Sequence, residues 1–272
     1  MPVAVGRSGI ENGEFHDPRL VPLYDLLCTW SRDDEFFLAE VNRAAAEVGR
    51  TAGARVLDLG CGTGRLTLAM VGAGHGVTGV DPAEPSLAVA RAKPGAERVR
   101  WIRGTSADVP TEGFDVAVMS SHVAQFIRDD REWAATLADL RRALAPGGRL
   151  VFDSRDPAAR GWRAWNPVES RRRVRLPDGC EVECWIEVTE VAGDVVSFVH
   201  HYRFLGSGEE LSASATLCFR PEQRLRASLA DAGFAVEAIY GGWGREPVGQ
   251  GDGEYVVVAR RPLGVAGASA VR

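Results

Sequence analysis

The chain has 272 residues, of which 45% are hydrophobic, so it can bury one sizeable core, or a core with a smaller sheet attached. Its formal net charge of −5 provides no overall basic surface for a phosphate backbone, which disfavours a nucleic acid as substrate. The sequence has no apolar run of 18 residues, so we expect a cytoplasmic protein with no membrane partner. Five scattered cysteines indicate reduced thiols and no metal site.

Two helices are expected near the N-terminus. Residues 1–18 mix glycine, proline and charged residues without periodicity, and we expect them to form a flexible arm. Residues 21–30 predict a first helix. Asp33 or Asp34 can cap a second helix, in which apolar residues recur at helical spacing and would face the core.

A glycine-rich stretch follows at residues 55–65, and the rest of the chain is organised around it. Apolar residues at its start predict a strand that is buried on both faces, as in the middle of a parallel sheet. Gly60, Gly62 and Gly64 then turn the chain into a helix whose first amide groups are free to face a ligand. A Cβ atom in this turn would hold a flat ligand away from the backbone. The stretch therefore predicts a cradle for a nucleotide-like ligand.

The spacing of the glycines distinguishes between types of nucleotide. A dinucleotide-binding loop has the pattern G-x-G-x-x-G, and here Arg65 occupies the place of the third glycine. The pattern is instead D-x-G-x-G-x-G, from Asp58 to Gly64, and a carboxylate at the strand end would repel a pyrophosphate but suit a cationic ligand. The stretch resembles the first motif of class I S-adenosylmethionine-dependent methyltransferases. Their cofactor, S-adenosyl-L-methionine, carries an amino-acid head and a sulfonium, and leaves as S-adenosyl-L-homocysteine.

The resemblance extends to further cofactor-binding motifs. Residues 76–80 predict a second strand that ends at Asp81, where the family has an acid that accepts hydrogen bonds from the ribose diol. Residues 104–110 resemble the loop that holds the adenine, with Asp108 as acceptor from its exocyclic amine. Tyr24 matches a tyrosine in the N-terminal helix that covers the cofactor in many small-molecule members. The resemblance thus implies these cofactor-binding residues: Tyr24, Asp58, Gly60, Cys61, Gly62, Gly64, Asp81, Pro82, Ser106, Ala107, Asp108 and Ser120.

The end of the fourth strand, predicted at residues 114–119, lies between cofactor and acceptor in this family. It lacks the Asn/Asp-Pro-Pro-Tyr signature of methylation on base amines or glutamine amides, and it lacks a carboxylate cluster for Mg²⁺. It contains His122, whose neutral imidazole is a candidate general base, with a structural histidine as the alternative. Tyr24 is the second catalytic candidate, or else a core aromatic residue with a hydrated hydroxyl.

The order of elements expected for this family is interrupted after the fifth strand. Asp129 or Asp130 can cap the preceding helix, and the turn at residues 145–148 resembles the family's turn into the fifth strand, at residues 149–153. Beyond Ser154, four segments rich in β-forming residues predict an inserted antiparallel sheet of three or four strands. These segments are residues 171–176, 180–191, 195–205 and 210–219. A last helix near Pro221 and two more strands then complete the sequence.

The sequence therefore predicts an α/β fold with a seven-stranded mixed sheet in the order 3-2-1-4-5-7-6, strand 7 antiparallel, helices on both faces, and an inserted small antiparallel β-sheet. We expect a cofactor-binding core at residues 19–154 and 220–260. Residues 155–219 would form a lid or a homodimer interface, with Trp162 and Trp165 facing the acceptor or the partner, and residues 261–272 a loose tail.

On this resemblance the expected activity is methyl transfer from S-adenosyl-L-methionine to an amine or hydroxyl of a small molecule, plausibly in specialised metabolism. Two alternatives remain open at this point: methylation of a peptide N-terminal amine, and a noncatalytic module that only binds the cofactor. A nicotinamide dehydrogenase is disfavoured by Arg65.

Overall fold

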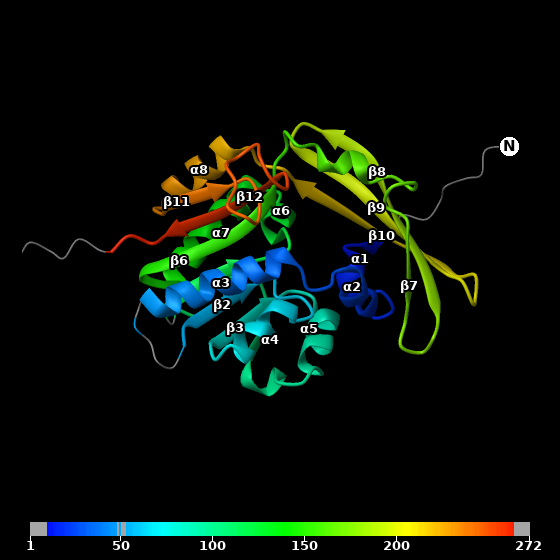
Figure 1. Cartoon of the computed structure of the whole chain (residues 1–272), viewed down its shortest axis with the longest axis horizontal. Coiled ribbons are helices and arrows are strands. Elements are labelled where there is room, and N and C mark those ends of the chain that lie inside the picture. Colours follow the sequence, from blue (N-terminus) through cyan, green and yellow to red (C-terminus); the bar gives the residue numbers. More distant parts are fainter. Residues whose placement is uncertain (1–9, 48, 50–52, 112, 264–272) are drawn as a thin grey trace, which may run out of the picture.

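The computed structural model of the chain describes residues 10–47, 49, 53–111 and 113–263. Figure 1 shows a large unit of helices around one sheet, a second sheet beside it, and two short helices from the start of the chain between them. No helix among the described residues is long and apolar enough to cross a membrane.

The larger sheet has seven strands. They are β2 (Arg55–Leu59), β3 (Gly76–Asp81), β4 (Arg100–Arg103), β5 (Phe114–Met119), β6 (Leu144–Arg155), β11 (Ala235–Tyr240) and β12 (Glu254–Arg260). Their order is β11-β12-β6-β5-β2-β3-β4. β2 pairs in parallel with β3 on one side and with β5 on the other. The order in which successive strands are added to the sheet therefore reverses direction at β2. β12 is antiparallel to β6 and β11. The predicted order and the antiparallel last strand are confirmed.

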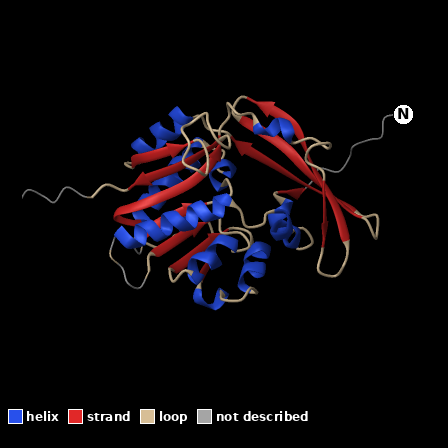
Figure 2. Ribbon diagram, in the orientation of Figure 1, coloured by secondary structure: helices blue, strands red, loops and turns tan. Residues whose placement is uncertain are grey.

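Helices cover both faces of this sheet (Figure 2). They are α3 (Arg32–Glu47), α4 (Arg65–Gly72), α5 (Glu84–Arg91), α7 (Asp130–Ala143) and α8 (Glu222–Asp231). α7 begins after Asp129, whose carboxylate accepts hydrogen bonds from the amides of Arg131 and Glu132, so Asp129 is the cap of the two candidates. Three 3₁₀ turns, Ala96–Arg98, Ser106–Asp108 and Gly161–Ala164, lie in the connections.

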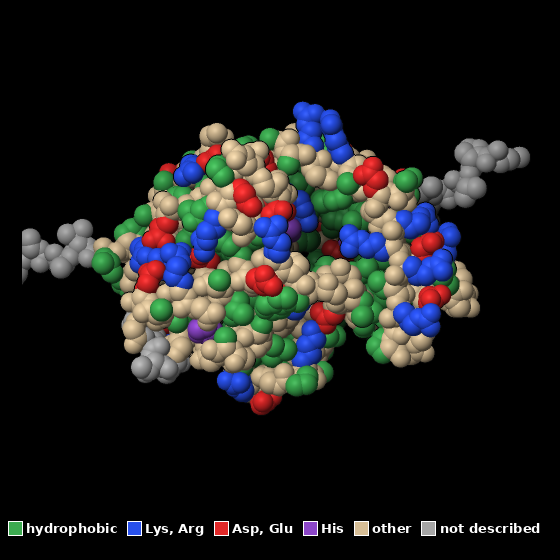
Figure 3. Space-filling model, viewed as in Figure 1, with side chains coloured by type: hydrophobic (Ala, Val, Ile, Leu, Met, Phe, Trp, Pro, Cys, Tyr) green, Lys and Arg blue, Asp and Glu red, His purple; other side chains and the backbone are tan. Residues whose placement is uncertain are grey.

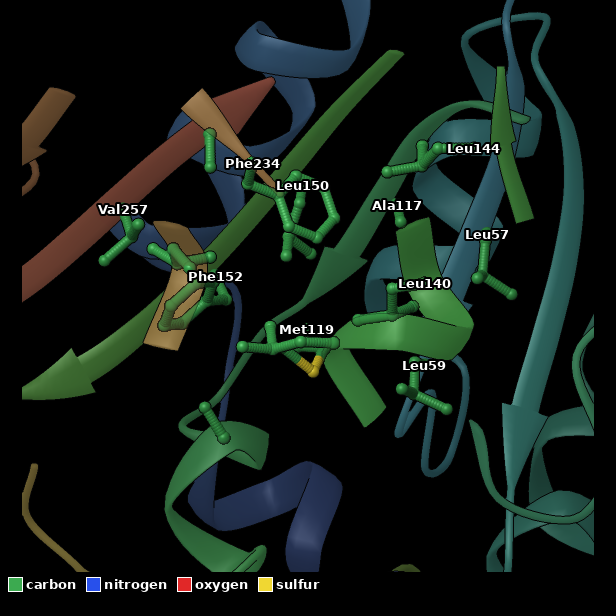
Figure 4. Close-up of a cluster of buried hydrophobic side chains, with 14 of the residues drawn as sticks. Leu57, Leu59, Ala117, Met119, Leu140, Leu144, Leu150, Phe152, Phe234 and Val257 are labelled. Carbon is green, nitrogen blue, oxygen red and sulfur yellow. The ribbon is translucent and has the colours of Figure 1, made fainter. Parts of the chain in front are cut away.

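The sheet is buried on both faces, which holds the ends of its strands in fixed positions. On one face, Leu57 of β2 and Phe152 of β6 belong to the same buried cluster as Leu140 of α7 (Figure 4). On the other face, Phe37 of α3 and Met70 of α4 pack in a second cluster. Because no polar face has to remain solvated, the central strands are runs of apolar residues, as the sequence predicted.

The second sheet has five strands in the order β1-β10-β9-β8-β7. They are β1 (Ile10–Glu11), β7 (Arg172–Arg175), β8 (Glu181–Ala192), β9 (Val195–Phe204) and β10 (Glu210–Cys218). The four predicted strands are present and antiparallel, and Gly179 and Gly193 take positive φ in the two predicted hairpin turns. β7 forms one edge, and four of the five residues 171–175 are arginine.

The start of the chain differs from the expectation of a flexible arm at residues 1–18. Residues 1–9 lie outside the described residues, but from Ile10 onward the chain is part of the fold. β1 pairs in parallel with β10, and α1 (Gly13–His16) and α2 (Val21–Leu27) follow directly. β1 is only two residues long, so no period-2 pattern marked it in the sequence.

The end of the chain also differs in part from the expectation of a loose tail. Arg261 donates from its guanidinium to the carbonyl oxygen of Arg141 at 2.8 Å, and its amide donates to that of Gly148 at the same distance. These bonds hold Arg261 beside α7 and β6. Residues 264–272 of the predicted tail lie outside the described residues.

Candidate active site

Two cavities with a common wall lie between the two sheets. The first has a volume of about 180 Å³ and lies at the carboxyl ends of β2, β3 and β5, where the strand order reverses. The second, about 350 Å³, extends from the first toward the second sheet. Figure 3 shows a hollow between the two parts of the molecule, with hydrophobic side chains inside it. Both cavities are lined by Phe15, Tyr24, Arg65, Ser121 and Phe126.

The glycine loop forms the floor of the first cavity. Gly60, Gly62 and Gly64 have φ values of 77°, 52° and 80°, in the left-handed region that favours glycine. A Cβ atom at Gly60 would lie 2.4 Å from Val123, and one at Gly64 would lie 2.8 Å from Trp101. Only at Gly62 is the added Cβ in open space. The expectation that Cβ atoms would displace the ligand thus applies to Gly62 alone, whereas Gly60 and Gly64 allow close packing inside the protein.

Asp58 in β2 has a buried carboxylate with one oxygen unpaired. The residue is 1% exposed and lines the first cavity. Its Oδ2 accepts a hydrogen bond from the Thr67 hydroxyl at 2.5 Å, but Oδ1 has no partner among the described residues. Burial raises the pKa of Asp58 to about 7. Because buried polar atoms are nearly always satisfied, this oxygen fits the cationic amino group of a bound S-adenosyl-L-methionine.

Asp81 at the end of β3 holds the glycine loop in place. Its Oδ2 accepts from the amide of Gly62 and its Oδ1 from the amide of Ala83, each at 2.8 Å. Each oxygen keeps further lone pairs, so the carboxylate can still accept bonds from a ribose diol. Burial raises the pKa of Asp81, and the two amides oppose this. Cys61 and Pro82 line the same cavity.

The predicted adenine-binding loop, residues 104–110, lies outside the lining of both cavities. Asp108 is exposed, and its Oδ2 accepts from the amide of Thr105 at 2.9 Å in a capping box. Ser106 is buried and donates from its hydroxyl to Asp139 Oδ2 at 2.9 Å. Neither these residues nor Ala107 line the cavities. The carboxylate of Asp108 therefore has a local structural partner, which the sequence pattern did not reveal.

Tyr24 of α2 lies where the two cavities meet. Its ring packs edge-on against Phe15, with centroids 5.6 Å apart, and Phe15 packs in turn on Phe126 at 5.5 Å. Burial raises the pKa of Tyr24, while a hydrogen bond to Ser121 opposes the shift. The hydroxyl thus stays protonated at neutral pH, which suits a hydrogen-bond donor better than a base. The aromatic rings also offer faces that attract a cationic group.

His122 follows β5 and lines the second cavity, while Ser120 lines the first. Ser121 and His122 both have positive φ, 56° and 64°, so the chain turns sharply before α6 (Val123–Phe126). The amide of His122 donates to both carboxylate oxygens of Asp153, at 3.0 and 3.1 Å. These bonds hold the strained turn and fix the position of the imidazole.

Two carboxylates that the sequence did not single out face this imidazole. The Nε2 atom of His122 lies 3.0 Å from Glu254 Oε2 and 3.3 Å from Asp153 Oδ2. Burial raises the pKa of Asp153 to about 6, and the His122 charge opposes the shift. Asp153 lies two residues before the end of β6, and Glu254 begins β12. Because the two strands are antiparallel neighbours, the predicted strand order contained a signal that could have located both residues.

The same three residues offer a set of possible metal ligands, since one atom from each lies within 4.8 Å of the others. Hydrogen bonds between His122 and the two carboxylates account for this grouping. The expectation of no metal stays a prediction.

Comparisons with known proteins agree with this geometry. The model of a family described as a methyltransferase domain matches residues 56–148. Cypemycin N-terminal methyltransferase from a Streptomyces species is 30% identical over 250 residues, which cover 90% of this chain and 97% of that protein. The chain therefore belongs to the S-adenosylmethionine-dependent methyltransferases.

Solved structures resemble the chain over most of its length. The amino pentose methyltransferase CalS10 from Micromonospora echinaspora, solved with bound S-adenosylmethionine, has a TM-score of 0.64 and 26% identity, over 89% of this chain and 96% of that chain. The sugar N-methyltransferase KedS8 from Streptoalloteichus has a TM-score of 0.71 at 20% identity, over 96% of this chain and 100% of that chain, and shows that the fold is shared.

Proposed function

We propose that the enzyme methylates the nitrogen of an amine-bearing small molecule, with the cofactor in the first cavity and the acceptor in the second. The main support for this proposal is that the two cavities share a wall. His122, which contacts Asp153 and Glu254, lines the cavity proposed for the acceptor. A methyl acceptor has to reach the cofactor without exposing the reaction to water, and two cavities with a shared wall allow this.

The residues of the first cavity match the chemistry of S-adenosyl-L-methionine. The unpaired oxygen of Asp58 would accept from the amino group, and Asp81 would accept from the ribose hydroxyls. The open space at Gly62 would let the ligand approach the backbone. When bound, the cofactor supplies an electrophilic methyl group on a sulfonium. The rings of Phe15, Tyr24 and Phe126 would attract this positive charge.

His122 would accept the proton that an ammonium group must lose before its nitrogen can attack. The contacts of Nε2 with Glu254 and Asp153 assign the ring proton to Nε2, so that it donates to a carboxylate. Nδ1 has no partner among the described residues, so its lone pair is available for a proton. Once protonated, the imidazole would be stabilised by the two carboxylates. General-base catalysis of this kind contributes about 10²- to 10⁴-fold in rate.

The nature of the acceptor follows in part from relatives. The 30% identical relative is named for methylation of the cypemycin N-terminus, and the 26% identical structure for methylation of an amino pentose. Both names indicate amine-containing acceptors, which favours nitrogen over a hydroxyl. A peptide N-terminal amine remains the second candidate, because the relative that matches along its whole length carries that name. Residues 155–219 would act as a roof over the acceptor, whereas a homodimer role stays a prediction.

The pH dependence of kcat for His122→Asn tests the role of the imidazole. Asparagine tolerates the left-handed backbone of this position, so the turn should survive the change. In the wild type, kcat should rise with pH as His122 loses its proton. The variant should lack this acidic limb and have a kcat lower by about 10²-fold or more. An unchanged profile with only KM raised would show that His122 is a wall of the pocket.

The acceptor for that assay is found by offering amino sugars and dipeptides together with a cofactor that carries a deuterated methyl group. Mass spectrometry of the product then identifies the labelled nitrogen. If only hydroxyl groups carry the label, the proposal of nitrogen as the acceptor atom is wrong.

A further inference from the structure

The lining of the second cavity also includes a second pair of titratable residues, Glu14 and His200. Glu14, in the first turn of α1, places Oε2 2.5 Å from Nδ1 of His200 in β9. The hydroxyl of Tyr202 lies 3.3 Å from the same nitrogen. Glu14 is only 8% exposed, and both Glu14 and His200 line the second cavity. A buried carboxylate in this place needs a functional or structural reason.

One oxygen of this carboxylate is free to bind a ligand. Oε2 is engaged by His200, but Oε1 has no hydrogen-bond partner among the described residues. Glu14 lines the second cavity and is absent from the lining of the first, so it lies on the side of the proposed acceptor. The carboxylate is held on one side and open on the other, which is the arrangement of an anchor for a cation.

Aromatic rings line the same cavity as this carboxylate. Phe15, the residue next to Glu14, packs against Tyr24 and Phe126. Phe198 lies 5.5 Å from the ring of His200 on the other side. All of these rings line the second cavity. A carboxylate within a set of aromatic faces matches the chemistry of an organic ammonium, because both attract positive charge while the rings exclude water.

We propose that Glu14 is the residue that binds the ammonium group of the acceptor, with His200 and Tyr202 positioning its carboxylate. The inference rests on the proposed function as an N-methyltransferase and deepens it. Glu14 would recognise the acceptor in its protonated form, and His122 would take the proton before methyl transfer. Specificity for amines over alcohols would thus be set in the binding step, by Glu14.

The chain contains a matched control pair. His201, the next residue in β9, contacts Glu187 of β8 at 3.5 Å on the opposite face of the sheet. This pair has the same chemistry but does not line either cavity. Glu187→Gln therefore removes an equivalent carboxylate without changing the proposed site.

The experiment measures calorimetric affinity for benzylammonium and for benzyl alcohol, its neutral analogue, with the protein saturated by S-adenosyl-L-homocysteine. Wild type and Glu187→Gln should prefer benzylammonium. Glu14→Gln should bind benzylammonium about tenfold more weakly or worse, with the affinity for benzyl alcohol unchanged. Glu14→Asp retains the charge and should keep a preference for benzylammonium. This second variant keeps the test decisive if Glu14→Gln folds poorly.

Several outcomes would overturn the proposal. Wild type without preference for the ammonium, or Glu14→Gln with the wild-type preference, would show that Glu14 does not bind the acceptor. If Glu14→Gln lost affinity for S-adenosyl-L-methionine but not for S-adenosyl-L-homocysteine, which lacks the sulfonium charge, Glu14 would be assigned to the sulfonium instead. Failure of the wild type to bind either form of the cofactor would contradict the proposed function itself, and is thus distinguishable from failure of the Glu14 proposal.

Discussion

The side chain of Asp58 is buried and one of its carboxylate oxygens is unpaired. We therefore expect the ionisation of Asp58 to be coupled to cofactor binding. Its pKa is raised to about 7 by burial, so near neutral pH a large share of the empty protein carries the neutral acid. The cationic amino group of the cofactor pairs with the ionised form. Binding near neutral pH or below should therefore release a proton from Asp58.

We expect the affinity for S-adenosyl-L-methionine to fall as the pH decreases below about 7. The loss should approach about tenfold per pH unit, because one proton must leave for each ligand bound. The measurement is calorimetry at pH 6 in buffers of different ionisation enthalpy, which counts the released protons. Asp58→Asn should bind more weakly by about 1.5 to 3 kcal/mol and without this pH dependence. Equal affinity of the wild type from pH 5.5 to 8 would contradict the coupling.

The strands and long helices were predictable because each has a repeating pattern and a boundary signal. β2 and β5 are largely apolar, each with one aspartate among its buried residues, and α7 has both a cap at Asp129 and a stripe at helical spacing. β1, α1 and α6 were not predictable, since elements of two to four residues contain no repeat. These short elements owe their form to partners distant in the sequence, such as β10 for β1.

The residues of the candidate site likewise divide into those that the sequence indicated and those that it did not. Asp58, Gly60, Gly62 and Asp81 belong to sequence motifs and line the first cavity, whereas Gly64 of the same loop does not. Glu14 lines the second cavity and Glu254 contacts His122, but both are brought there from distant parts of the sequence, so no local pattern indicated them. Asp108 shows the opposite case, because a carboxylate that matched a motif serves as a local cap.

Two glycines of one loop should respond differently to alanine. Gly60→Ala brings Cβ within 2.4 Å of Val123 and adds left-handed strain, so it should lower the free energy of unfolding by about 2 kcal/mol or more. Gly62→Ala meets no protein atom and should cost about 1 to 2 kcal/mol through strain alone. It should, however, weaken cofactor binding. Urea unfolding with calorimetry separates the two effects, and equal loss of stability in both variants would contradict this account.

The molecule as a whole combines an α/β unit, whose glycine loop lines the first cavity, with a second sheet that lines part of the second cavity. The segment between them supplies both parts with aromatic residues. Trp162 packs on Phe219 with centroids 4.8 Å apart, whereas Trp165 packs on Phe198 and lines the second cavity. Both tryptophans were expected to face the acceptor or a partner. Trp165 lines the cavity proposed for the acceptor, Trp162 lines neither cavity, and the partner alternative stays a prediction.

Trp165→Ala should raise the acceptor KM about tenfold, because it removes an apolar wall of the second cavity. Trp162→Ala should leave KM unchanged. Both variants should lose stability by about 2 to 4 kcal/mol, since each tryptophan is half-buried against an aromatic partner. The check is a comparison of steady-state kinetics with thermal unfolding. A KM change of equal size in both variants would mean that the roof acts only through its overall stability.

The arginines at β7 affect whether two copies of the chain can pair at this edge of the second sheet. Arg173 and Arg175 of β7, and Arg171 just before it, pair with glutamates of β8, while Arg172 lines the second cavity. An exposed edge strand is a template for another chain, and a row of cations makes it a poor one. If two copies joined at this edge, like charges would face each other along the seam. The arginines therefore disfavour the joining of two second sheets into one continuous sheet at β7.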